Sequence, residues 1–228
     1  MTGFYRHCVS MTSTTATIPA PLGLDDPRPT FARSAAIART AVAGVRPEQM
    51  TNPTPCGTYD VRQLLVHLLF AFNRAAVVGR NENPFVGSEE FEPADGDWVG
   101  AWDRTAQAVE AAWADPVALT RPTMLPWAAE SGALALRSYV AELSTHTWDL
   151  AQATGQQPAW DDEVLTMSLD VMRAILPAEG RREMFDAILA TMPEEMHGGP
   201  APYDEAVPVD ADAPLIDQLV AHVGRHPA

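Results

Sequence analysis

Positive charge is scarce in this sequence, and lysine is absent. All 15 basic residues are arginine, whereas 30 acidic residues bring the formal net charge to -15. Nucleic-acid binding depends on basic surfaces that neutralise phosphates, and anionic membrane surfaces attract the same kind of residue. The charge balance therefore argues against nucleic-acid and membrane partners.

The sequence also has few cysteines and no long apolar run. Cys8 and Cys56 are its two cysteines, and a single pair is not a disulfide framework. No stretch approaches the roughly 20 consecutive apolar residues of a membrane helix, and the first residues lack the apolar segment of a secretory signal. We therefore expect a cytoplasmic protein, either a monomer or a homodimer. Because no histidine lies near Cys56 in the sequence, we expect this cysteine to pack as a small buried apolar residue rather than to act as a nucleophile.

Apolar residues make up 46% of the 228 positions, which is enough to form one sizeable core. They recur at helical spacing, and prolines and glycines separate the helical patterns. We expect an all-α protein, a four-helix bundle with a small, mostly helical C-terminal extension. The expected bundle helices are residues 31–45, 61–79, 98–114 and 133–155, and further helices are expected at 161–176, 182–192 and 215–224. The expected divisions are a disordered tail at 1–28, the bundle at 29–156 and a C-terminal region packed on it at 157–228.

Helix ends carry their usual residues. Thr30 can cap the first helix, and either Thr58 or Asp60 can cap the second. Gly155 follows the fourth helix as its C-terminal stop.

Three side chains suggest a metal site. His67 lies midway along the second helix, which is otherwise apolar almost all round, and a buried imidazole needs a polar partner. Glu142 and His146 are four residues apart on the fourth helix, so they share one face and could reach one cation. Two ordinary alternatives stay open at this point, a hydrogen-bonded core histidine at 67 and a surface ion pair between Glu142 and His146.

The number of donors predicts the kind of site. Two histidines and one carboxylate leave a coordination position open, as in catalytic zinc sites, and they also suit non-haem iron(II). Paired Glu-x-x-His motifs are missing, so one ion is expected rather than two. Asp149, on nearly the same face as His146, could hold the second imidazole nitrogen or act as a catalytic base. The remaining histidines are expected to be solvated: His7, His197, His222 and His226.

Three stretches resemble a known family. TPCGTYDVRQLLVHLL, ELSTHTWDLAQATGQ and the C-terminal VPVDADAPLIDQLVAHVGRHP resemble the actinobacterial mycothiol-dependent maleylpyruvate isomerase-like proteins, within the DinB/YfiT-like four-helix-bundle superfamily. Tyr59 stands where that family commonly has tryptophan. The resemblance implies that His67, Glu142 and His146 are metal ligands. It also implies a divalent ion in an open site, with zinc expected and nickel or iron(II) as alternatives.

The resemblance also implies a function. Characterised relatives isomerise maleylpyruvate with mycothiol or transfer low-molecular-weight thiols onto electrophiles, so a thiol and a small electrophile are the expected partners. We expect a metal-dependent enzyme that uses such a thiol, mycothiol first, for S-transfer or isomerisation. The alternatives are a metal-dependent hydrolase, which would turn over without thiol, and a non-catalytic metal- or ligand-binding protein. The last would have a metal site without a cavity for a thiol cofactor.

Overall fold

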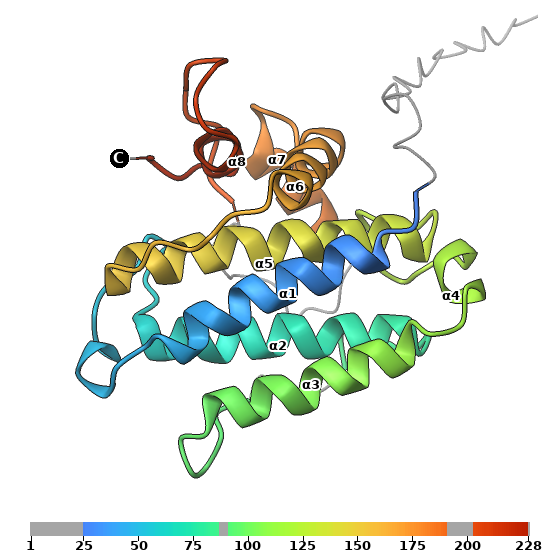
Figure 1. Cartoon of the computed structure of the whole chain (residues 1–228). Coiled ribbons are helices and arrows are strands. Elements are labelled where there is room, and N and C mark those ends of the chain that lie inside the picture. The colour runs from blue at the N-terminus through green and yellow to red at the C-terminus, as the bar shows by residue number, and fades with distance from the viewer. Residues whose placement is uncertain (1–24, 87–90, 191–202, 228) are drawn as a thin grey trace, which may run out of the picture.

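The computed structural model describes residues 25–86, 91–190 and 203–227, and these form helices without any strand. The four long helices of the bundle are α1 (Arg28–Ala43), α2 (Val61–Gly79), α3 (Trp98–Ala112) and α5 (Gly132–Thr154). The shorter helices are α4 (Val117–Thr120), α6 (Asp162–Ile175), α7 (Arg181–Leu189) and α8 (Leu215–His222), with a 3-10 turn at Pro47–Gln49. The expected all-α, DinB-like bundle with a helical C-terminal extension is confirmed (Figure 1).

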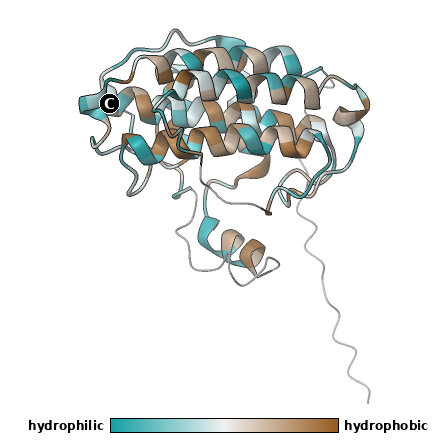
Figure 2. Ribbon diagram, turned by 90° about the horizontal axis from the view of Figure 1, so that it is seen from below, coloured by the Kyte–Doolittle hydropathy of each residue, from teal (hydrophilic) through white to brown (hydrophobic). Residues whose placement is uncertain are grey.

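The core lies between the four long helices. Helix α2 packs against α3 and α5, while α1 packs against α5 and α3. Phe72 of α2 stacks on Trp102 of α3 with ring centroids 4.4 Å apart, and Phe31 of α1 lies 6.0 Å from the same phenyl ring. Figure 2 shows that apolar residues recur along the bundle helices, which is the pattern that buries one stripe of each helix.

Helix α2 is long and apolar enough to span a membrane, but 56% of its apolar stretch is buried inside the protein. It contacts two other long helices, and Leu64, Leu68 and Phe72 are almost fully buried. Burial among neighbouring helices is the ordinary reason for such composition in a bundle.

The helix ends follow the sequence with one exception. The Asp60 carboxylate accepts from the Gln63 backbone N–H and caps α2, and Gly155 ends α5 in the left-handed conformation at φ 69°. The predicted Thr30 cap is wrong, because α1 begins earlier, at Arg28, with prolines around its first turn. The Thr30 hydroxyl donates instead to the Glu163 carboxylate at 3.2 Å.

Helices α6 and α8 lie against α5, on the side of the bundle away from α3 (Figure 1). Helix α6 packs on α5, and α8 packs mainly on α6. Arg181, which is 1% exposed, ties this region together, because its guanidinium donates to the backbone carbonyls of Pro177, Asp204 and His222. The expected boundaries at residues 28 and 156 stay predictions, and residues 1–24 lie outside the described part of the chain.

Candidate metal centre

Helices α2 and α5 bring the three predicted ligands together. His67 Nε2 lies 3.2 Å from Glu142 Oε1 and 3.2 Å from His146 Nε2, and the remaining pair, His146 Nε2 and Glu142 Oε1, is 3.4 Å apart. Donors about 2.0–2.2 Å from a tetrahedral ion would lie about 3.4 Å from one another. The three separations therefore fit one cation, and the donor set of two imidazoles and one carboxylate suits zinc or iron(II).

Glu142 and His146 each stabilise the charged form of the other. Burial opposes charge on both Glu142 and His146, but their mutual attraction is stronger. The two histidines hold the pKa of Glu142 well below its usual value, whereas Glu142 and Asp149 hold the pKa of His146 well above its usual value. The carboxylate is thus ionised and ready to hold a cation, while a proton on His146 must leave before its Nε2 can do so.

Asp149 holds His146 from the side away from the other two donors. His146 Nδ1 lies 2.9 Å from Asp149 Oδ2, and Asp149 is fully buried. Arg225 donates to both oxygens of this carboxylate, at 3.0 and 3.1 Å. The chain Arg225–Asp149–His146 fixes the imidazole with Nε2 toward His67 and Glu142, as second-layer carboxylates do at metal sites. These contacts favour the positioning role of Asp149, and the role of catalytic base stays a prediction.

Tyr203 and Arg225 are site residues that sequence reasoning missed. The Tyr203 hydroxyl donates to Glu142 Oε2 at 2.6 Å, so it orients the carboxylate and leaves Oε1 for the two histidines. Burial and the neighbouring carboxylate raise the pKa of Tyr203 well above its usual value, which keeps it a neutral donor. Both residues belong to the C-terminal segment, far from α2 and α5 in sequence. Arg225 lies in the stretch that resembles the family's C-terminal end, whereas Tyr203 precedes that stretch and has no such cue.

The triad lies on the wall of a cavity of about 420 Å³. Cys56 and Tyr59 come from the loop before α2, and Met172, Leu176 and Phe185 supply an apolar wall from α6, the end of α6 and α7. The expectation that Cys56 is a buried packing residue is only partly met. Its side chain is half-buried and lines the cavity, and its sulfur lies within 4.8 Å of donor atoms of His146 and Asp149.

The other histidines differ from one another. His226 is exposed as expected, but the prediction that His222 is solvated is wrong. It is partly buried against α6, and its Nε2 donates to the Leu176 carbonyl at 3.2 Å, while burial lowers its pKa. His7 and His197 lie outside the described residues.

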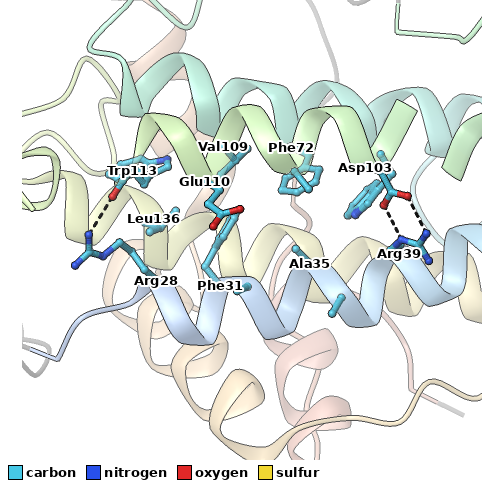
Figure 3. A pocket seen from close by; sticks show the side chains of 14 residues that line it. Arg28, Phe31, Ala35, Arg39, Phe72, Asp103, Val109, Glu110, Trp113 and Leu136 are labelled. Carbon is cyan, nitrogen blue, oxygen red and sulfur yellow. Dashed lines mark hydrogen bonds and ion pairs between the residues drawn. The ribbon is translucent and has the colours of Figure 1, made fainter. Parts of the chain in front are cut away.

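A second cavity, of about 490 Å³, separates α1 from α3 (Figure 3). Its wall is mainly apolar, and polar contacts cross between the two helices at either end. Arg39 forms a bidentate pair with Asp103, at 2.6 and 2.8 Å, and the Arg28 guanidinium donates to the Trp113 carbonyl at 3.1 Å. The metal-ligand candidates of the described residues lie at the other cavity.

A family model described as the mycothiol maleylpyruvate isomerase N-terminal domain matches residues 31–151, more than half of the chain. The chain belongs to this family. It is therefore a member of a mycothiol-related family of DinB-like metal-binding proteins, as the resemblance of its motifs implied. The match includes α2 and α5, which carry the three candidate ligands.

Relatives of similar length are known in mycobacteria. Two strains of Mycobacterium tuberculosis each have a relative, described as an uncharacterized protein, that is 29% identical over 187 residues. The alignment covers 81% of this chain and 89% of the relative, so it extends beyond the residues matched by the family model. No solved structure matches the chain.

Proposed function

We propose that this protein is a metal-dependent enzyme that uses a low-molecular-weight thiol, mycothiol first, for S-transfer to or isomerisation of a small electrophile. The observation that carries the proposal is that His67, Glu142 and His146 converge on one point in the wall of a cavity of about 420 Å³. Three protein donors leave room for a further ligand, as catalytic metal sites do. Membership of a mycothiol-related family supports a thiol as that ligand.

The cavity favours an enzyme over a protein that merely stores a metal. Small-molecule sites commonly have volumes of about 300–1,000 Å³ and are lined by apolar side chains with a few polar groups. The cavity beside the triad has such a volume, and its wall combines Met172, Leu176 and Phe185 with the polar groups of the site. A metal-binding protein without catalytic activity would not need this space.

Each residue of the site would have a separate role. His67, Glu142 and His146 would hold the cation, which would favour the thiolate form of a bound thiol. Asp149 fixes the imidazole of His146, and Tyr203 fixes the carboxylate of Glu142, so neither donor has to be ordered when the ligands bind. The apolar wall from α6 and α7 would limit the access of water to the reacting atoms.

A two-by-two assay tests the proposal. The protein, stripped with a chelator or reloaded with zinc, is mixed with chlorodinitrobenzene in the presence or absence of mycothiol. We expect the rate of conjugate formation to exceed the uncatalysed rate only when metal and thiol are both present. His226→Ala, at an exposed histidine that does not line the cavity, should behave like the wild type, whereas His67→Ala should not.

Each other outcome has a meaning. Equal rates in stripped and loaded protein would reject the metal-dependent thiol reaction. Metal-dependent consumption of an ester without thiol would assign the site to hydrolysis. Stoichiometric metal binding without turnover of either substrate would leave a binding protein.

A further inference from the structure

Two hydrogen-bond donors in the cavity have no acceptor among the residues that the structure describes. Tyr139 is 4% exposed and lines the cavity, and its hydroxyl has no hydrogen-bond partner in the described part of the chain. Arg74 also lines the cavity, and no described residue accepts from its buried Nε. Within residues 25–86, 91–190 and 203–227, no carboxylate pairs with Arg74. Leaving buried donors unsatisfied is costly, so such groups commonly mark a place for a ligand or an ion.

Neighbouring polar groups on the same wall are satisfied. Trp127 Nε1 donates to Ser138 Oγ at 3.3 Å, and the Ser138 hydroxyl donates to the Ala135 carbonyl at 2.7 Å. The guanidinium of Arg74 stacks over the Phe70 ring, 4.2 Å from its centroid. This stacking fixes the plane of the guanidinium but uses none of its N–H donors. Of the described residues with a buried polar atom that lacks a partner, Arg74 and Tyr139 are the ones that line this cavity.

Both donors lie on the same side of the triad, because α2 and α5, which carry it, run in opposite directions (Figure 1). Arg74 follows His67 by seven residues on α2, which places it on the same face and about 10 Å further along the axis. Tyr139 precedes Glu142 by three residues on α5, on the same face and about 4.5 Å further along. A ligand that reaches from the triad to these two donors thus spans at most about 10 Å.

A carboxylate matches what the two donors lack. Arginine is permanently cationic and presents N–H groups in a planar fork, and burial raises the pKa of Tyr139, so its phenol stays protonated and donates. Both groups then need acceptors, and a carboxylate offers two oxygens and the opposite charge.

We propose that Arg74 and Tyr139 form a carboxylate-binding subsite, and that the electrophile in the proposed reaction carries an acid group that binds there. The subsite stands on its own geometry, and only its assignment to the electrophile rests on the proposed function. Mycothiol has no carboxylate, so the acid falls to the electrophile when mycothiol is the thiol.

The subsite is tested first without metal or turnover. Binding of hexanoate and hexanamide, which have the same length and differ in charge, is measured by ligand-observed NMR on the full chain with a chelator present. We expect hexanoate to bind about tenfold more tightly than hexanamide to the wild type, as for a hydrogen bond to a charged group. Arg74→Gln should abolish this preference, and Tyr139→Phe should reduce it several-fold.

Two further variants control the binding test. Arg62→Gln, on the same helix but ion-paired to Glu92 outside the cavity, should keep the full preference. Arg74→Lys keeps the charge without the fork and should keep part of the preference. Equal binding of acid and amide to the wild type, or an unchanged preference in Arg74→Gln, would overturn the subsite. If Arg74→Gln does not fold, an unchanged preference in both Arg74→Lys and Tyr139→Phe overturns it.

A crossed assay on metal-loaded protein identifies the source of the acid. Mycothiol is paired with 6-(iodoacetamido)hexanoic acid or its amide, and glutathione, a thiol with carboxylates, is paired with iodoacetamide. We expect Arg74→Gln to raise KM for the acidic electrophile alone. A rise that follows glutathione instead would assign the acid to the thiol and overturn the second half of the proposal. No turnover in any pair would count against the proposed function, while the NMR result would still decide the subsite.

Discussion

The two cavities of the bundle have similar volumes, about 490 and 420 Å³, but they differ in whether the arginines that line them have polar partners. Between α1 and α3 the polar groups at the ends are matched, with Arg39 on Asp103 and Arg28 on a backbone carbonyl. Beside α2 and α5 two imidazoles and a carboxylate converge, and Arg74 has no carboxylate partner among the described residues. Volume alone would not distinguish the cavities, whereas the count of unmatched donors and acceptors does.

The largest expected difference between variants at the two cavities is in zinc binding. His67→Ala should abolish stoichiometric zinc binding, because the remaining donors, Glu142 and His146, come from one helix and hold an ion weakly. Metal analysis of the purified variant, after dialysis against a weak chelator, measures this. Asp103→Ala at the other cavity is the matched control and should bind zinc as the wild type does. Unchanged metal content in His67→Ala would refute the ligand set.

The α1–α3 cavity should matter for stability instead. Trp102 is 1% exposed and stacks on Phe72, so Trp102→Ala should lower the free energy of unfolding by about 3–5 kcal/mol. Urea denaturation followed by circular dichroism measures the loss. The folded variant should keep its zinc affinity, and a matching loss of zinc affinity would show that the two cavities are not independent.

Asp149→Asn tests whether the carboxylate that contacts His146 Nδ1 positions this ligand. Loss of the carboxylate behind His146 should weaken zinc binding by about 10–100-fold, the usual effect of removing such a partner. Competition with a chromophoric chelator gives the affinity. Asp161→Asn, at the half-buried N-cap of α6 outside the cavity, is the control for a lost charge. An unchanged zinc affinity in Asp149→Asn would remove the positioning role.

The pH dependence of zinc binding follows from the raised pKa of His146. Below that pKa the imidazole is protonated on both nitrogens, so affinity should fall about tenfold for each unit of pH decrease, the effect of one competing proton. Protonation of His146 has the opposite effect on the stability of the metal-free protein. The stabilisation by the imidazolium is fully present below the unfolded-state pKa near 6.5, and it is lost as the pH rises through the raised pKa of the folded state. Zinc titrations between pH 6 and 9 check the first trend, and a flat profile would contradict it.

The smallest effect is expected at the end of the α1–α3 cavity. Arg39 and Asp103 are each nearly half exposed, so Arg39→Ala should change the free energy of unfolding by about 0.2–1 kcal/mol. Zinc affinity should not change. A larger loss would mean that this ion pair holds the two helices together and is more than a surface contact.

Local and repetitive features were predictable from the sequence. The apolar pattern of α2, the Asp60 cap and the Gly155 stop depend on neighbouring residues, and all agree with the structure. His67, Glu142 and His146 could be named together because helical spacing and the family motifs pointed to the same face.

Features that depend on distant parts of the chain were not predictable. Tyr203 and Arg225 reach the site from the C-terminal segment, and no local pattern indicates where that segment packs. His222 looked like a solvated residue of the C-terminal segment because its acceptor, the Leu176 carbonyl, is distant in sequence. The missing partners of Arg74 and Tyr139 could be recognised only with every neighbour in place.

The buried Arg181 supports the candidate site from a distance. Its guanidinium holds the backbone at Asp204 and His222, and the same segment carries Tyr203 and Arg225 to the site. Any loosening of this one side chain would release the groups that orient Glu142 and Asp149. The order of the candidate metal centre therefore depends on a contact made outside the cavity, by a residue that touches none of the three candidate ligands.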